Sequence, residues 1–315
     1  VLVLFGTMFV AMLFGVPLGF SVALATIVAF CVFTDSPLTL IAQSCVTGID
    51  SFSFIAIPLF IMAGVLMSKG GIAKRLIDTF YVLVGDKNGG LGLVAVVTSG
   101  FFGAISGSAT ATVSAIGGLM MPEMEEKGYP PAYNAMCIAA AGSTSLLIPP
   151  SVCLVIYGVA TETSVGDLLI AGIMPGILTV LTLSFSAWYY AKKNNFYKIE
   201  HQPVSLFFKK FWAAKWAILC PVIIIGGIYT GIFTPTESAA VAVIYAILIG
   251  FFVYKNLTLK VLYESLKEAM VLSGMVAFML GTATAFAKFL SIAGVPAKLV
   301  EFITGITDNP IILLL

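Results

Sequence analysis

The chain contains 315 residues, of which 60% are hydrophobic and 10% are charged, and its formal net charge is +1. Soluble domains carry about 25% charged residues, so this composition argues against a soluble protein and predicts an all-α polytopic membrane protein. The near-zero net charge gives no indication of nucleic acid binding. The five cysteines are scattered without metal-ligand spacing, and their odd number argues against a disulfide framework.

The first apolar run extends to about Phe33 and predicts one spanning helix. The loop after it contains Asp35 and Asp50 but no basic residue, so the positive-inside rule places this loop outside. A second span, residues 55–67, returns the chain to a basic, cytoplasmic side. The amphipathic segment that follows, residues 70–85, is typical of a helix lying along the membrane interface.

Two apolar stretches follow, residues 91–121 and 132–160, and a span at 168–190 then leads to six lysines between residues 192 and 215. That basic loop is cytoplasmic only if one of the two stretches does not cross the membrane. The better candidate is 91–121, because its flanks are charged and its middle, GAISGSATATVSAIGG, is rich in Gly, Ser and Thr. We expect a re-entrant helical hairpin there, with a tilted helix packed through its small residues as the alternative.

The second apolar stretch contains GSTSLLIPPS at residues 142–151. Pro149 and Pro150 cannot both continue a helix, because proline lacks the backbone donor and its ring clashes with the preceding turn. We expect a broken transmembrane helix there, with a kinked helix as the alternative. A hairpin tip and a broken helix close together in sequence are the parts from which many transporters build sites at the membrane midplane.

The segment GVPAKLVEFI, residues 294–303, is similar to GIAKRLIDTF, residues 71–80, with two identical and four conservatively replaced positions. The two segments fall on opposite sides of the membrane in this topology, which predicts inverted-topology repeats. On the spacing between them, a counterpart of Ser106 would lie beyond Leu315. We therefore expect a truncated second repeat, and a chain that lacks roughly a quarter of the natural protein.

Further spans near residues 216–231, 238–254 and 269–290 complete the topology. The expected organisation has five parts: scaffold-type helices of the first repeat at 1–68, an interfacial amphipathic segment at 69–90, the transport-domain hairpin and broken helix at 91–167, a helix and a basic cytoplasmic loop at 168–215, and an outward helix with the start of the second repeat at 216–315.

Four motifs carry a resemblance to a known family: GGIYTGIFTPTESAAVAVIYAILIG at 226–250, IPLFIMAGVLM at 57–67, SGSATATVSAIGGLMMPEM at 106–124 and LLIPPS at 146–151. Together they resemble the large membrane subunit of tripartite ATP-independent periplasmic (TRAP) transporters, in the ion-transporter superfamily. The resemblance implies a multi-pass secondary transporter of a bacterial or archaeal inner membrane, driven by sodium and working by an elevator motion. It also implies partners: a small four-helix membrane subunit, a periplasmic substrate-binding protein and an organic acid such as a C4-dicarboxylate or sialic acid.

Sodium is the coupling ion that the resemblance implies, and no other cofactor or metal is expected. Residues 91–121 and 132–160 contain no Asp, Glu, His, Lys or Arg, which favours a cation held by neutral oxygens over a proton relay. His201, the only histidine, is expected to be a surface residue. The candidate sodium ligands are the hydroxyls of Ser106, Ser108, Thr110, Ser143, Thr144 and Ser145 and the carbonyls of Gly103, Gly142 and Ile148, with Gly107 allowing the turn.

An anionic substrate is expected near helix N-termini, whose backbone donors and positive dipole favour carboxylates. The helices that start after Ser108 and after Pro150 are the candidates. The residues expected near the substrate are Ala109, Pro149, Pro150 and Ser151. Glu237 follows a Thr at the start of a span, where a capping role and a functional role are equally open.

Other classes of protein fit the sequence less well. A sodium-coupled carrier of the related dicarboxylate type, working without a binding protein, is the first alternative. An integral membrane enzyme is less favoured, because the acid cluster of Glu123, Glu125 and Glu126 has no histidine or cysteine beside it. A channel fits less well, because inverted repeats with broken helices suit alternating access better, although some channels share them. A purely structural subunit would not explain paired, site-like breaks.

Overall fold

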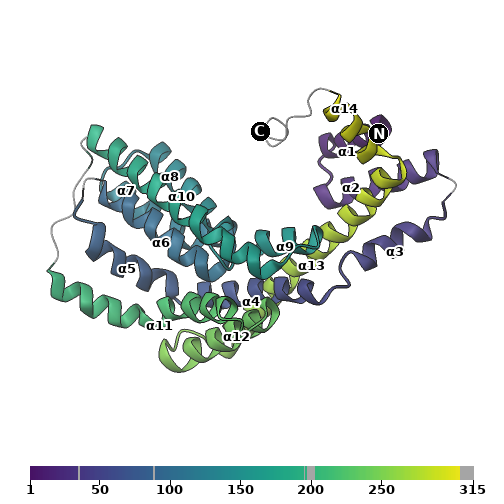
Figure 1. Ribbon diagram of the computed structural model, residues 1–315. Coiled ribbons are helices and arrows are strands. Elements are labelled where there is room, and N and C mark those ends of the chain that lie inside the picture. The colour runs from purple at the N-terminus through teal and green to yellow at the C-terminus, as the bar shows by residue number, and fades with distance from the viewer. Residues whose placement is uncertain (35, 88, 195, 197–202, 306–315) are drawn as a thin grey trace. The chain divides into compact units, whose positions relative to one another are not determined.

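The computed structural model describes residues 1–34, 36–87, 89–194, 196 and 203–305, and every regular element in these residues is a helix (Figure 1). The predictions for Asp35, Lys198 and His201 therefore fall outside the described residues. Within the described residues, five segments are long and apolar enough to cross a membrane: Phe52–Lys69, Val165–Lys193, Leu206–Tyr229, Pro235–Val253 and Leu259–Ile292. The chain is thus a multi-pass helical membrane protein, as its composition predicts.

The described chain divides into two compact units, which we treat separately. The first contains residues 1–51 and 274–315. Its core is a pair of aromatic rings, Phe30 and Phe289, with centroids 5.4 Å apart. Leu4, Ala25 and Ala29 are buried around them. The helices of this unit are α1 (Leu2–Leu13), α2 (Leu18–Phe33), α3 (Thr39–Thr47), the C-terminal part of α13 (Leu259–Ile292) and α14 (Val295–Thr304).

The prediction of one helix up to Phe33 is wrong, because the chain turns between α1 and α2. Gly15 has a φ of 78°, in the left-handed region that favours glycine. Its N–H bonds to Met12 O at 2.9 Å, and Val16 N–H bonds to Ala11 O at 3.1 Å. These two bonds form a Schellman motif, which ends α1 and satisfies its last carbonyls.

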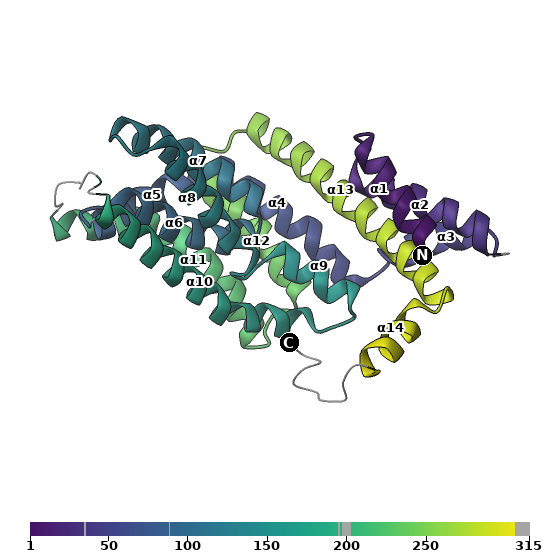
Figure 2. The same cartoon turned by 90° about the horizontal axis from the view of Figure 1, so that it is seen from above.

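The second unit, residues 52–273, carries both site-like segments. In it α6, α7, α8 and α10 lie side by side, and α4 lies along α12 (Figures 1 and 2). Its elements are η1 (Phe52–Ile55), α4 (Ala56–Lys69), α5 (Ile72–Val84), α6 (Gly90–Ser106), α7 (Ala109–Glu126), α8 (Pro131–Ser143), η2 (Thr144–Leu146), α9 (Val152–Ala160), α10 (Val165–Lys193), α11 (Val204–Tyr229), α12 (Pro235–Leu248), η3 (Ile249–Val253) and the N-terminal part of α13.

The two unusual apolar stretches are interrupted at the predicted places. The stretch 91–121 is two helices, α6 and α7, which are joined by Gly107 and Ser108 and pack against each other. The single tilted helix is therefore wrong. The stretch 132–160 forms α8, the short η2 and α9, with a non-helical segment at residues 147–151.

The basic segment after α10, predicted as a loop up to residue 215, is more helical than predicted. α10 runs to Lys193 and α11 begins at Val204, so Lys209, Lys210 and Lys215 lie in a helix and not in a loop. Lysine is a good helix former, and its long stem can pack while its charge reaches the surface.

Glu237 has a capping role at the start of α12. Its carboxylate accepts hydrogen bonds from the backbone N–H and the hydroxyl of Thr234, both at 2.8 Å, while Glu237 N–H bonds to Thr234 Oγ1 at 3.3 Å. This is a capping box, which satisfies two donors of the first turn reciprocally. The structure thus favours the local role over a functional one.

The contact between α4 and the hairpin gives the first prediction. A Cβ added at Gly64 of α4 would lie 2.5 Å from Ser106 O and 2.9 Å from Ser106 Cα. Because both neighbours are backbone atoms, we expect Gly64→Ala to destabilise the permease by about 2 kcal/mol and to lower its thermal unfolding midpoint in detergent.

Gly118→Ala is the matched control. Gly118 lies in α7 with nothing within 4 Å of an added Cβ, so the change should be neutral or slightly stabilising through helix propensity. Equal unfolding midpoints for Gly64→Ala and Gly118→Ala would show that α4 and the hairpin do not approach each other this closely.

Candidate functional site

The tip of the hairpin is a two-residue turn. Gly107 has a φ of 61° and its N–H bonds to Gly103 O at 2.8 Å, which closes the last turn of α6. Ser108 is extended and caps α7, with Ser108 Oγ accepting a hydrogen bond from Ala111 N–H at 3.4 Å. Only a residue that tolerates a positive φ permits so tight a reversal.

Hydroxyl groups surround this turn. Ser106 Oγ and Thr112 Oγ1 are 3.1 Å apart and both residues are buried. Thr112 also donates to Ser108 O at 2.8 Å, and Ser108 Oγ lies 3.0 Å from Thr110 Oγ1. Thr112 was missed by the sequence analysis, although it belongs to the same small, hydroxyl-rich run.

The break after α8 is a second cluster of hydroxyls. Ser143, Thr144 and Ser145 each donate to the backbone carbonyl three residues earlier, at 2.7, 2.7 and 2.6 Å. A hydroxyl that donates its proton in this way keeps oxygen lone pairs for another partner. Ser151 Oγ donates to Leu146 O at 2.7 Å and caps α9 by accepting from Leu154 N–H at 3.5 Å.

The structure brings the tip and the break into direct contact. Val152 N–H donates to Gly107 O at 3.2 Å. A Cβ added at Gly107 would lie 2.5 Å from Pro150 O, and one added at Gly103 would lie 2.7 Å from Ser145 Cα. We call this contact, formed by residues 103–109 and 142–152, the tip–break junction.

The predicted site residues are not all in the buried part of the junction. Ser106, Gly107, Ser145, Pro150 and Ser151 are buried there, together with Gly103, Gly142 and Thr144, while Ala109 is half-buried beside Gly142.

Other predicted residues lie at its margin. Thr110 and Ser143 are exposed. Ile148 and Pro149 lie against α10, since Cβ atoms added at Gly176 and Gly172 would meet them at 2.7 and 3.7 Å respectively. Only part of the predicted ligand set is therefore gathered in one place.

Four helix ends meet at the tip–break junction. α6 and η2 end there, and helix C-termini present carbonyl oxygens with partial negative charge. α7 and α9 begin there, and helix N-termini present N–H donors with partial positive charge. The two stretches contain no ionisable Asp, Glu, His, Lys or Arg between residues 91 and 121 or 132 and 160. This arrangement offers neutral oxygens to a cation and backbone donors to an anion.

Interrupted helices that meet inside a multi-pass protein are the parts from which many membrane transporters build their sites. Comparison with known proteins agrees: residues 5–315 match the family described as "Tripartite ATP-independent periplasmic transporter, DctM component". The chain belongs to this family, a family of transporter components and not of enzymes.

Three relatives show the extent of the similarity. The chain is 40% identical to the isethionate TRAP transporter permease protein of Oleidesulfovibrio alaskensis, over 99% of the chain and 49% of that protein. It is 37% identical to the C4-dicarboxylate TRAP transporter large permease protein of Rhodobacter capsulatus, over 96% of the chain and 72% of that protein. It is 37% identical to the sialic acid TRAP transporter permease protein of Haemophilus influenzae, over 97% of the chain and 50% of that protein. The chain thus spans about half the length of two of these relatives.

The tip–break contact gives the second prediction. We expect Gly107→Ala to destabilise the permease by roughly 3 kcal/mol, because the new Cβ combines the cost of a positive φ with a clash against Pro150 O. The midpoint of thermal unfolding in detergent measures this loss.

Gly128→Ala separates the two causes. Gly128 also has a positive φ, 78°, and also ends a helix, but nothing lies within 4 Å of an added Cβ. Gly128→Ala should lower the free energy of unfolding only by the backbone strain, about 1 kcal/mol. A Gly107→Ala variant that is no less stable than Gly128→Ala would contradict the contact between tip and break.

Proposed function

We propose that this chain forms the substrate-carrying part of a sodium-coupled secondary transporter that takes up an organic acid by an elevator motion. Membership of the DctM family supports transport as the activity. The observation that carries the proposal further is the tip–break junction, in which Val152 N–H donates to Gly107 O at 3.2 Å among neutral oxygens.

Sodium suits the chemistry of this junction. Na⁺ is a hard cation that needs oxygen ligands and no proton exchange, and carbonyls at helix C-termini and unwound segments provide them. Ser145 Oγ donates to Gly142 O at 2.6 Å, so its own lone pairs can face a cation without loss of that bond. Ser106, Gly103 and Ser145 are our central ligand candidates, because all three are buried where the tip meets the break.

The substrate is proposed to bind on the other helix ends. α7 starts after Ser108 and α9 after Ser151, and both serines cap their helices with the side-chain oxygen. The remaining N–H donors and the helix dipoles favour a carboxylate or another anion. The relatives are named for isethionate, C4-dicarboxylates and sialic acid, and we extend an acidic substrate of this kind to the present chain.

Internal symmetry supports the elevator mechanism. α5 follows Gly71, with a φ of 76°, and α14 follows Gly294, with a φ of 65°. These are the two similar segments from which we infer inverted repeats, and repeats of this kind build alternating access in many transporters. Because Gly64 closely approaches Ser106, we propose that the moving part includes α4 together with the hairpin, which departs from our assignment of residues 1–68 to the scaffold.

The family description supports a tripartite assembly. We propose a small membrane subunit and a periplasmic substrate-binding protein as partners, in a bacterial or archaeal inner membrane. A carrier that works without a binding protein is the alternative, and the transport assay below distinguishes the two because it includes and omits that protein.

The coupling is tested with the permease reconstituted in proteoliposomes together with its small subunit and binding protein. We expect radiolabelled organic-acid uptake to require an inward sodium gradient, and a proton gradient alone to give no uptake, since the junction offers no titratable group. Uptake at equal rates with and without sodium would reject the coupling. Uptake that does not need the binding protein would favour the alternative carrier.

The ligand assignment is tested by Ser106→Ala and Ser108→Ala in the same assay. Loss of one oxygen ligand should raise the sodium concentration for half-maximal uptake by roughly tenfold. Ser114→Ala, which alters an exposed serine of α7, is the control and should leave sodium dependence unchanged. If neither Ser106→Ala nor Ser108→Ala changes it, the two hydroxyls are not ligands.

A further inference from the structure

A basic pocket lies away from the tip–break junction, between α5, α11 and the segment after η3. Its volume is about 350 Å³, and Lys74, Arg75, Asp78, Lys210 and Asn256 line it. Three cations face one carboxylate there, which leaves an excess of positive charge. Lys69, one turn before α5, is already paired with Glu268 at 2.7 Å. The Lys69–Glu268 ion pair is therefore separate from the charged groups that line the basic pocket.

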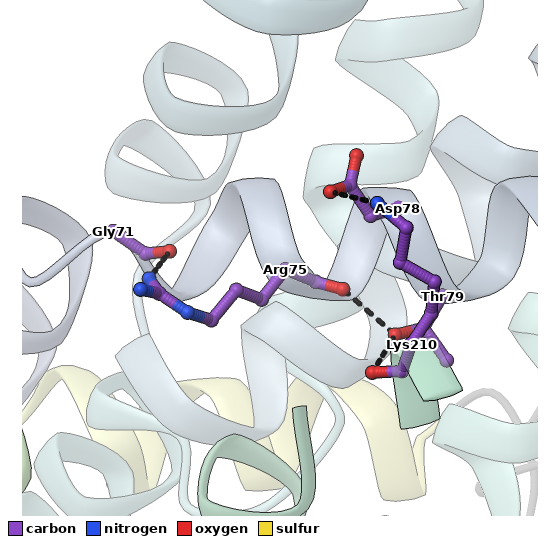
Figure 3. A network of polar contacts seen from close by, with 5 residues as sticks. All are labelled: Gly71, Arg75, Asp78, Thr79 and Lys210. Atoms are coloured by element: carbon purple, nitrogen blue, oxygen red, sulfur yellow. Dashed lines mark hydrogen bonds and ion pairs between the residues drawn. The ribbon is translucent and has the colours of Figure 1, made fainter. Parts of the chain in front are cut away.

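Two of the three cationic groups, those of Arg75 and Lys210, are held in place by contacts within the protein. The Arg75 guanidinium donates to Gly71 O at 2.9 Å and lies 3.8 Å from the centroid of the Tyr254 ring. Figure 3 shows Lys210 Nζ paired with Asp78 Oδ2 at 3.0 Å. A guanidinium carries five donors in a planar fork that suits phosphate oxygens, and the contact with Gly71 leaves donors for a ligand.

A side-chain hydroxyl on α5 also links α5 to α11 at this point. The Thr79 hydroxyl lies 2.8 Å from Arg75 O on its own helix and 3.3 Å from Lys210 O on α11 (Figure 3). Asn256 Nδ2 donates to Gly70 O at 3.3 Å, which fixes the third wall of the pocket. A preformed pocket loses little conformational entropy when a ligand binds.

The surroundings are those of a membrane interface. α5 buries one face, which includes Leu76 and Phe80, while Lys74 on the other face is exposed. On α11, Lys215 lies 3.9 Å from the ring centroid of Trp212, which is 67% exposed. Amphipathic helices and exposed tryptophans beside lysines are typical of the lipid headgroup region.

A second hollow of about 290 Å³ adjoins the basic pocket across the Asp78–Lys210 ion pair. Ile77, Val82 and Leu206 give it an apolar wall, and Glu123 also lines it. A small inorganic anion would have no use for such a wall, whereas the glycerol and acyl portion of a lipid would.

We propose that the basic pocket binds the phosphodiester of an anionic phospholipid. Lys74, Arg75 and Lys210 contact the phosphate oxygens. The glycerol and the start of an acyl chain pack against the apolar wall of the second hollow, which Ile77, Val82 and Leu206 form. Basic pockets between helices on the cytoplasmic side are known to hold anionic headgroups. The lipid would then join α5 to α11 at the interface.

The test uses the intact permease in nanodiscs of phosphatidylcholine, with a rising fraction of phosphatidylglycerol. Phosphatidylglycerol should raise the thermal unfolding midpoint in a saturable way, and inorganic phosphate should not. Lys74→Gln/Lys210→Gln removes two charges, while the glutamine at position 210 can still donate to Asp78. This variant should need about tenfold more phosphatidylglycerol for the half-maximal shift.

Lys209→Gln/Lys215→Gln is the matched control, because it removes two charges from α11 outside the pocket lining; it should respond like the unaltered protein. Lys74→Gln alone, on an exposed side chain, gives a second readout if the double variant fails to fold. An unchanged lipid response in these pocket variants overturns the proposal. A midpoint shift produced by inorganic phosphate also overturns it. So does a pocket variant that keeps its lipid response but loses the small subunit on purification, because the pocket would then contact that subunit and not a lipid.

Discussion

The unpaired backbone of an interrupted helix is the constraint on which this structure depends. A helix that stops in an apolar environment leaves carbonyls and N–H groups that must find partners within the protein. Here the tip and the break satisfy each other, since Val152 N–H bonds to Gly107 O. The approach is possible only because Gly103 and Gly107 lack a Cβ at the two points of closest contact. The first role of the small residues in this region is therefore to let the two backbone segments come close enough to hydrogen-bond.

Most of the fold could be predicted from the sequence because the membrane imposes strong rules. Apolar length predicted spans that the structure has as helices, and the lysines near α10 and α11 led us to expect a hairpin at 91–121, where the structure has two helices, α6 and α7. Pro149 and Pro150 predicted the break because two consecutive prolines remove two donors, whereas the single prolines Pro122, Pro175 and Pro221 lie inside helices. The turn at Gly15 had a signal that the sequence analysis missed. Pro17 follows Gly15 by two residues, and a glycine with a proline shortly after it is typical of a helix C-terminus, whereas Gly6, which lies within α1, has no such proline.

The site was predictable as two segments but not as a set of atoms. Ser106, Gly107 and Ser145 meet because a hairpin tip packs on a break, whereas Thr110 and Ser143, which belong to the same hydroxyl-rich runs, are exposed. Helical geometry turns neighbouring hydroxyls to different faces, so composition alone cannot choose among them. The alternative of packing through small residues also holds for part of the hairpin: a Cβ at Gly117 would lie 2.9 Å from Ile138 Cγ2. The same run of residues thus packs α7 against α8 and shapes the tip.

Fully charged side chains lie where water can hydrate them, and this rule links the two proposed sites, the tip–break junction and the basic pocket. At the tip–break junction, where ionisable side chains would be costly, the structure uses helix ends and hydroxyls whose partial charges need little hydration. At the interface, Arg75 and Lys210 keep full charges that are only half-buried and partly compensated by Asp78. A transported ion must leave its site again, which weak neutral ligands permit. The proposed lipid headgroup that joins α5 to α11 has no such need, so full charges held by Tyr254 and Asp78 suit a site that stays occupied.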